Sequence, residues 1–121
     1  MLLAGIALAG AIGALARYLV DVVVIRRGAL GLPVATLTIN VTGSFVLGVL
    51  TGLALYHALP ATPKTVLGTG FCGAYTTFST FAYEVVHLAE QRKAREASAV
   101  LALSVVVPAL VAGLGLALAS L

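Results

Sequence analysis

One short segment of this chain gathers residues that could do chemistry inside a long apolar stretch. It runs from Gly68 to Phe81, GTGFCGAYTTFSTF, and four of the five residues from Thr76 to Thr80 carry a hydroxyl group. Glycine and β-branched threonine are poor helix formers, and hydroxyl groups offer hydrogen bonds that compete with the helix ladder. We therefore predict a broken helix near Gly73 to Thr77, with an ordinary kinked helix as the alternative.

A helix break inside a membrane leaves backbone N–H and C=O groups without helical partners. Such groups are tolerated there only where protein or an ion satisfies them. Carbonyl oxygens freed in this way suit a small hard cation such as Na⁺, as in the discontinuous helices of transporters. The break is therefore a candidate ion site.

Two aromatic rings follow the predicted break. Phe78 and Phe81 are three residues apart, so they share one face of a helix, and Ser79 and Thr80 lie between them. An aromatic ring has a positive edge and a negative face, so ring edges can meet a small anion that has shed its water. Hydroxyl and amide donors supply the stronger contacts. The simpler interpretation is two phenylalanines that face the core or the lipid.

A stripe of small and polar residues repeats at every fourth position of an earlier apolar stretch. Its members are Thr36, Asn40, Ser44, Gly48 and Gly52. We interpret Ser44, Gly48 and Gly52 as a packing seam, because small residues let two membrane helices approach closely. Asn40 differs, because an amide in hydrocarbon is costly unless it has a partner. We predict that Asn40 faces a partner helix or a water-filled path.

Three further polar positions are candidates for an ion path. Ser104 precedes Pro108 by one turn, and proline removes the helix hydrogen bond to the Ser104 carbonyl, which predicts a polar spot at a kink. Arg17 and Asp21 are either an ion pair one turn apart or part of a vestibule in which Arg17 concentrates anions. We interpret Glu84 as a capping or vestibule-lining residue rather than a catalytic group.

The composition indicates which elements must hold these residues. Of the 121 residues, 61% are hydrophobic and only 9% are charged, more apolar surface than a small soluble domain can hide. Four apolar stretches reach the roughly 20 residues that span a bilayer. They cover about 2–24, 34–56, 65–88 and 97–120. We expect one all-α transmembrane domain over 1–121, with short loops, antiparallel neighbours and both termini on one side of the membrane.

The charges support a membrane protein rather than a nucleic-acid-binding one. The net charge is +3, and the basic residues lie at the ends of the apolar stretches, where they anchor helices in the headgroup region. Five of them fall on one side of the membrane, Arg26, Arg27, Arg92, Lys93 and Arg95, and only Lys64 and the α-amino group fall on the other. This bias predicts termini outside the cytoplasm. The first stretch lacks a basic n-region, so we expect a mature helix rather than a signal peptide. One cysteine, Cys72, excludes an internal disulfide.

Taken together, these motifs resemble the Fluc (CrcB) family of fluoride channels. The segment from Gly13 to Tyr18, GALARY, is similar to the family's first-helix motif. The segment from Thr36 to Phe45, TLTINVTGSF, is similar to its second, and Gly70 to Phe81 is similar to its third-helix signature. The resemblance implies a channel, not an enzyme, in the inner (plasma) membrane. It would export cytoplasmic fluoride by passive conduction and so give fluoride resistance.

The resemblance also implies an assembly and roles for single residues. It implies a dual-topology dimer of antiparallel subunits with two fluoride pathways, and a structural Na⁺ at the two-fold axis on the backbone carbonyls of Gly73 and Thr76. The implied fluoride pathway contains Asn40, Phe78, Phe81, Thr80 and Ser104. Pro108 falls where some relatives have a hydroxyl residue. The strong charge bias departs from dual topology, so a paired subunit of opposite orientation is the alternative to the homodimer.

Two other functions fit parts of the sequence. A small four-helix multidrug-type exporter would need a mid-membrane carboxylate to couple protons, whereas Asp21 is near the end of its stretch. A non-transporting membrane scaffold would explain the glycines but not Asn40 or the broken helix. An intramembrane enzyme is not expected, because His57 and His87 lie at helix ends without a nucleophile–base pair.

Overall fold

The computed structural model describes residues 1–27 and 34–121, and in this part of the chain every regular element is a helix. The elements are α1 (Leu2–Arg27), α2 (Val34–Tyr56), α3 (Ala61–Thr65), the π-helix η1 (Val66–Cys72), α4 (Gly73–Tyr75), α5 (Ser79–Glu90) and α6 (Ala94–Ala119). The predicted loop with two glycines and a proline lies in 28–33, outside the described residues.

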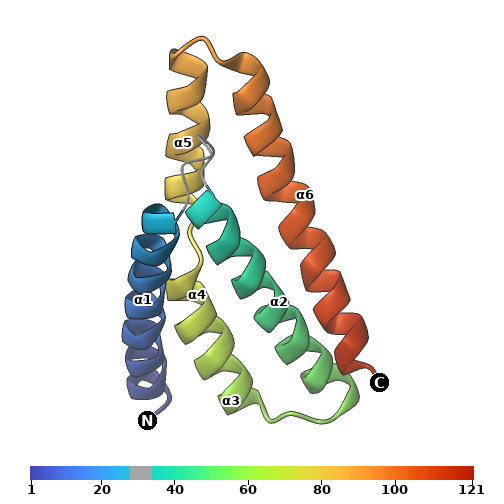
Figure 1. The fold of residues 1–121 in the computed structure, drawn as a ribbon. Coiled ribbons are helices and arrows are strands. Elements are labelled where there is room, and N and C mark those ends of the chain that lie inside the picture. The colour runs from blue at the N-terminus through green and yellow to red at the C-terminus, as the bar shows by residue number, and fades with distance from the viewer. Residues whose placement is uncertain (28–33) are drawn as a thin grey trace.

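The described chain forms four helical passages that run alternately up and down. In Figure 1, α2 crosses the centre, with α1 and the rod formed by α3, η1 and α4 on one side and α6 on the other. Both termini lie at the same end of the molecule (Figure 1). Three helices are long and apolar enough to cross a membrane, at Leu2–Val23, Val34–Tyr56 and Ala94–Ala119. The predicted all-α fold with a broken third passage is confirmed.

The third passage breaks where the hydroxyl-rich run begins. Helix α4 ends at Tyr75, Thr76 is extended with ψ 161°, and α5 begins at Ser79. Before the break, the chain winds as a π-helix, in which the Gly73 N–H reaches the Gly68 carbonyl five residues back. The π-helix is not foreseen by the sequence argument. The passage is also longer than the predicted 65–88, since it runs from Ala61 to Glu90.

Glycines bring two pairs of elements into backbone contact. On α2, a Cβ at Gly48 would overlap the Ala112 carbonyl oxygen of α6, and a Cβ at Gly52 would lie 2.9 Å from the Leu116 carbonyl oxygen. On η1, a Cβ at Gly70 would lie 2.9 Å from the carbonyl oxygen of Ile6 in α1. Any side chain at these positions would push the helices apart. Gly48 and Gly52 therefore pack against α6, whereas the neighbouring Ser44 lines a cavity.

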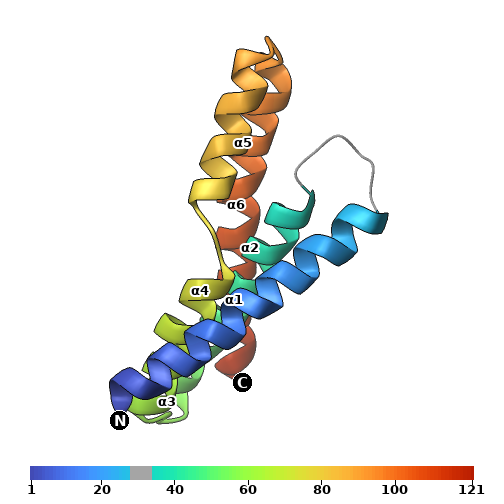
Figure 2. The ribbon, with the colours of Figure 1, turned by 90° about the vertical axis from the view of Figure 1, so that its left-hand side faces the viewer.

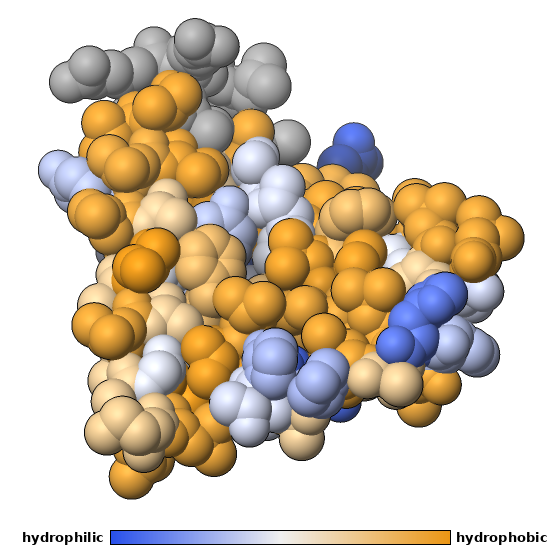
Figure 3. Space-filling model, turned by 90° about the horizontal axis from the view of Figure 1, so that it is seen from below, coloured by the Kyte–Doolittle hydropathy of each residue, from blue (hydrophilic) through white to orange (hydrophobic). Residues whose placement is uncertain are grey.

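The buried core is small and most of the surface is apolar. One cluster, Phe81, Leu88, Ala97 and Val100, fills the α5–α6 hairpin, which extends beyond α1 and α2 in Figure 2. Seen from below, the surface is largely hydrophobic (Figure 3), and many large apolar side chains are exposed. Water would not stabilise such a surface, so lipid or another protein must cover it.

Candidate functional site

A cavity of about 340 Å³ lies beside the helix break and collects most of the predicted site residues. Its lining includes Asn40, Ser44, Gly73, Thr76, Phe78, Phe81, Ser104 and Pro108. These residues come from α2, the two sides of the break, and α6. Helix α6 runs on through Pro108, whose ring nitrogen has no hydrogen to offer the Ser104 carbonyl. Thr80, Arg17 and Glu84 are not part of this lining.

The amide of Asn40 makes two hydrogen bonds to one residue in the break. Its Nδ2 donates to the Thr77 carbonyl oxygen at 2.8 Å, and its Oδ1 accepts from the Thr77 backbone N–H at 2.9 Å. This pairing supplies the partner that a membrane-buried amide needs. The sequence indicates the need for a partner, but the identity of that partner follows only from the structure.

The two helix ends at the break present groups of opposite polarity. At the end of α4, the backbone N–H and the hydroxyl group of Thr76 both donate to the Cys72 carbonyl oxygen at 2.9 Å. At the start of α5, the Thr77 hydroxyl oxygen accepts from the Thr80 N–H at 3.3 Å. The last carbonyls of a helix carry partial negative charge and the first N–H groups carry partial positive charge. One side of the break therefore suits a cation, and the other side suits an anion.

The two phenylalanines occupy different environments. Phe81 is 7% exposed and belongs to the α5–α6 core, whereas Phe78 is 76% exposed. Their ring centroids are 5.5 Å apart, and the rings meet edge to face at 74°. Both line the cavity. The Phe78 ring therefore packs on the buried Phe81 ring with one side and is exposed with the rest.

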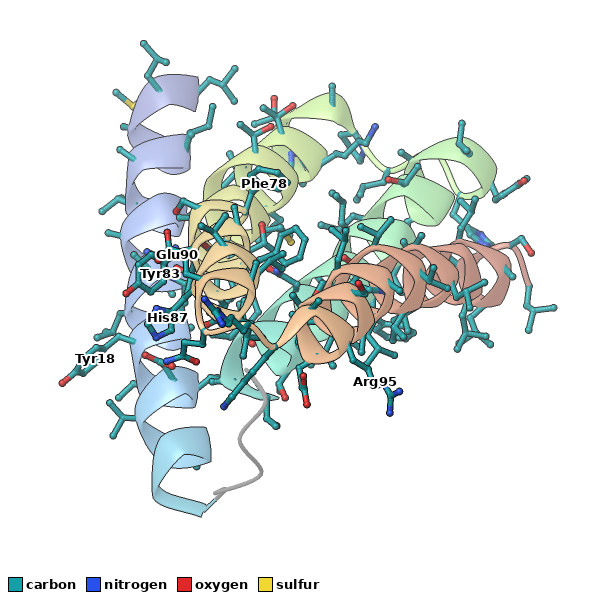
Figure 4. All side chains as sticks on the ribbon, turned by 90° about the horizontal axis from the view of Figure 1, so that it is seen from above. Tyr18, Phe78, Tyr83, His87, Glu90 and Arg95 are labelled. Atoms are coloured by element: carbon teal, nitrogen blue, oxygen red, sulfur yellow. The ribbon has the colours of Figure 1, made fainter. Side chains whose placement is uncertain are left out.

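A second cavity, of about 250 Å³, adjoins the first at Thr77, which lines both. It is the more polar of the two, and its lining includes Arg17, Asp21, Thr36, Thr77 and Thr80. Among the described side chains, no ion pair joins Arg17 to Asp21. Arg17 therefore keeps its charge available to the cavity. Figure 4 shows Tyr18, the next residue, pointing outward from α1.

Glu84 connects α5 to α2 beside the second cavity. Its Oε1 accepts a hydrogen bond of 2.8 Å from the Thr36 hydroxyl group, while its Oε2 is buried and has no partner among the residues that the structure describes. From the sequence, Thr36 belongs to the polar stripe of 34–56 and Glu84 is a capping or vestibule-lining residue, and nothing there indicates that the two pair. Their positions in the sequence could have indicated the pair. Thr36 lies one turn before Asn40, and Glu84 lies one turn after Thr80.

Tyr75 is a site residue that the sequence argument missed. It is buried as the last residue of α4, its hydroxyl group lies 2.8 Å from the Thr42 hydroxyl oxygen, and its ring stacks on Phe71. A Cβ at Gly43 would overlap the Thr76 methyl group and lie 3.1 Å from the Tyr75 ring. Helix α2 therefore holds the end of α4 in place through Thr42 and Gly43.

Comparison with known proteins places the chain in a family. A sequence model of the family described as CrcB-like protein, Camphor Resistance (CrcB), matches residues 4–116. The chain belongs to the CrcB family. It is 54% identical over 92 residues, 76% of this chain and 67% of the relative, to Fluoride-specific ion channel FluC 1 of Leifsonia xyli subsp. xyli. It is 47% identical over 111 residues, 92% of this chain and 85% of the relative, to Fluoride-specific ion channel FluC 2 of Mycobacterium tuberculosis.

A third relative carries the same channel name. Fluoride-specific ion channel FluC of Methanocaldococcus jannaschii is 45% identical over 86 residues, which cover 71% of this chain and 68% of that protein. The family match extends from α1 into α6, so it includes the break and both cavities.

Proposed function

We propose that this chain is a subunit of a fluoride-selective channel that lets fluoride leave the cytoplasm by passive conduction. The observation that carries the proposal is the cavity at the helix break. Its lining is largely apolar and includes the Asn40 amide and the Phe78 and Phe81 rings at the start of α5. The CrcB relatives named as fluoride-specific ion channels support the same function.

The chemistry of this cavity suits a small anion. Fluoride holds its water strongly, so a path that removes this water must replace it with donors and positive partial charge. An amide N–H, hydroxyl groups and aromatic ring edges provide these without a fixed positive charge that would trap the ion. We assign Asn40, Phe78, Phe81 and Ser104 to the path, and Thr80 and Arg17 to the adjoining polar cavity. Glu84 supports that cavity from behind through its hydrogen bond to Thr36.

The complete channel in this proposal is a dimer of antiparallel subunits. Phe78 and Gly73 are exposed in the single subunit, and a second copy would cover them and close the cavity. We favour a homodimer, and the charge bias keeps a paired subunit of opposite orientation as the alternative. We expect the channel to lie in the plasma membrane, surrounded by lipid.

The proposal includes a structural Na⁺ on the backbone carbonyls of Gly73 and Thr76. The residues fit such an ion, because these carbonyls lie at the end of α4, where no following helical turn covers them. Gly73 is exposed and carries no side chain that would obstruct an approaching ion. When bound, the ion would neutralise the negative end of α4 and that of an opposed second subunit.

Fluoride efflux from liposomes that contain the purified protein tests the proposal. A fluoride electrode records the release, valinomycin carries K⁺ as the counter-ion, and a parallel run measures chloride. Rapid fluoride release with little chloride release, lost in Phe78→Ala, is the expected result. A folded dimer that releases no fluoride, alone or with a paired subunit, would contradict it.

A further inference from the structure

The double hydrogen bond between Asn40 and Thr77 does more than satisfy a buried amide. We propose that Asn40 is the positioning residue that keeps the third passage broken, and that it thereby links the anion path to the cation site. The link to the two ions rests on the proposed function, whereas the role in the break rests on the geometry alone.

Thr77 lacks the two backbone hydrogen bonds that a continuous helix would give it. In a continuous α-helix, the Thr77 N–H would donate to the Gly73 carbonyl and the Thr77 carbonyl would accept from the Phe81 N–H. Neither bond occurs in the described backbone. The Asn40 amide makes both contacts instead, at 2.9 Å and 2.8 Å. One side chain has replaced both helical partners of a single residue.

This replacement frees the Gly73 carbonyl group. Because Asn40 takes the Thr77 N–H, the Gly73 carbonyl has no backbone donor within the described part of the chain. A Cβ at Gly73 would meet nothing of its own subunit closer than the Gly68 carbonyl oxygen at 3.8 Å. The freed oxygen is thus available to a partner from outside the subunit, as a ligand for a hard cation must be.

The same pairing also determines which polar atom of Asn40 faces the cavity. Because Oδ1 must face an N–H and Nδ2 must face a carbonyl, the pairing fixes which end of the amide is the nitrogen. The nitrogen carries two hydrogens. One hydrogen is used by Thr77, and the other has no protein partner among the described residues. Asn40 lines the cavity, so it presents an N–H donor there, which favours an anion over a cation.

The test reads the pairing and the cation response separately. Thr76–Thr77 is the only Thr-Thr pair in the sequence, so protein labelled with ¹³C-carbonyl and ¹⁵N threonine gives one carbonyl-to-amide NMR correlation, that of the Thr77 N–H. The second readout is the melting midpoint of protein purified with Na⁺ or with N-methyl-D-glucamine. Variants are Asn40→Ala, the isosteric Asn40→Asp, and the control Ser44→Ala, which lies one turn on in the same cavity lining.

We expect Asn40→Ala to move the Thr77 signal and to abolish a Na⁺-dependent rise of several degrees in the midpoint, while Ser44→Ala keeps both. Asn40→Asp keeps an acceptor for the Thr77 N–H but repels the Thr77 carbonyl, so it should lose the Na⁺ response even where Asn40→Ala does not fold. An unmoved Thr77 signal in Asn40→Ala, or a Na⁺ response that survives both variants, overturns the proposal. Expected results here with no fluoride release from the wild type would contradict the proposed function and leave the positioning role intact.

Discussion

At the scale of single residues, Phe78 and Phe81 divide the work of one aromatic pair. Replacing Phe81 with alanine should lower stability by about 2 kcal/mol or more, because it empties part of the α5–α6 core. Replacing Phe78, which is exposed in the single subunit, should leave the stability of the subunit's own fold nearly unchanged and lower fluoride release at least tenfold. Thermal unfolding in detergent and liposome efflux measure the two effects. Equal destabilisation by both substitutions would contradict the assignment.

The Thr36–Glu84 hydrogen bond gives a second prediction at this scale. Thr36→Val removes the donor to Glu84 Oε1 and leaves a half-buried carboxyl group without a partner, since Oε2 already has none among the described residues. We expect a loss of about 1–3 kcal/mol in the free energy of unfolding. The matched control is Thr51→Val, because Thr51 donates only to the Leu47 carbonyl of its own helix. Similar losses in both variants would show that the bond to Glu84 is not special.

At the scale of elements, the close approach of α2 to α6 depends on Gly48. Gly48→Ala should separate the two helices and cost about 1–3 kcal/mol, because its Cβ would overlap the Ala112 carbonyl oxygen. Gly113→Ala is the control, since a Cβ there meets nothing within 4 Å of its own subunit. That change should be neutral or stabilise by up to about 1 kcal/mol, as expected for Gly to Ala inside a helix. Chemical denaturation of both variants decides.

The elements also show what the sequence could and could not predict. The break was predictable because glycines and hydroxyl residues oppose a regular helix at that point. The π-helix was not, because local helix propensity does not distinguish the five-residue hydrogen-bond spacing of Val66–Cys72 from that of an α-helix. Likewise, a buried amide predicts that Asn40 has a partner, but choosing Thr77 requires the relative placement of α2 and the break. The same holds for Thr36 and Glu84.

At the scale of the whole molecule, we expect substitutions at Gly43 to affect folding of the subunit and substitutions at Gly73 to affect assembly of the proposed dimer. A Cβ at Gly43 would overlap Thr76 within the subunit, whereas a Cβ at Gly73 would make only an ordinary contact of 3.8 Å with the Gly68 carbonyl oxygen. Gly43→Ala should therefore destabilise the fold itself. Gly73→Ala should keep helicity and lose the dimer, together with the Na⁺ response. Light scattering after size-exclusion chromatography, with circular dichroism as the control, measures this. A stable Gly73→Ala dimer would move the proposed two-fold axis away from the break.

The exposed side chains of the described helices fit a molecule that lies in a membrane. Figure 4 shows Arg95 pointing away from α6 at the end opposite the termini, where a charged side chain can reach the headgroups. Along the helices, by contrast, many large apolar side chains are exposed, among them Leu15, Val46 and Leu110. These apolar side chains need lipid or another protein to cover them.

The exposed position of Gly73 has a consequence for inheritance after gene duplication. A duplicated copy that acquires alanine at 73 should still fold as a subunit, because a Cβ there would meet nothing of its own subunit closer than 3.8 Å. At Gly43, by contrast, every copy meets the same obstruction from its own Thr76. In the proposed dimer, selection at 43 acts on each gene alone, whereas selection at 73 acts on the pair of products that meet there. In lineages with two copies, substitutions at 73 should therefore arise in matched sets, whereas 43 stays fixed in both.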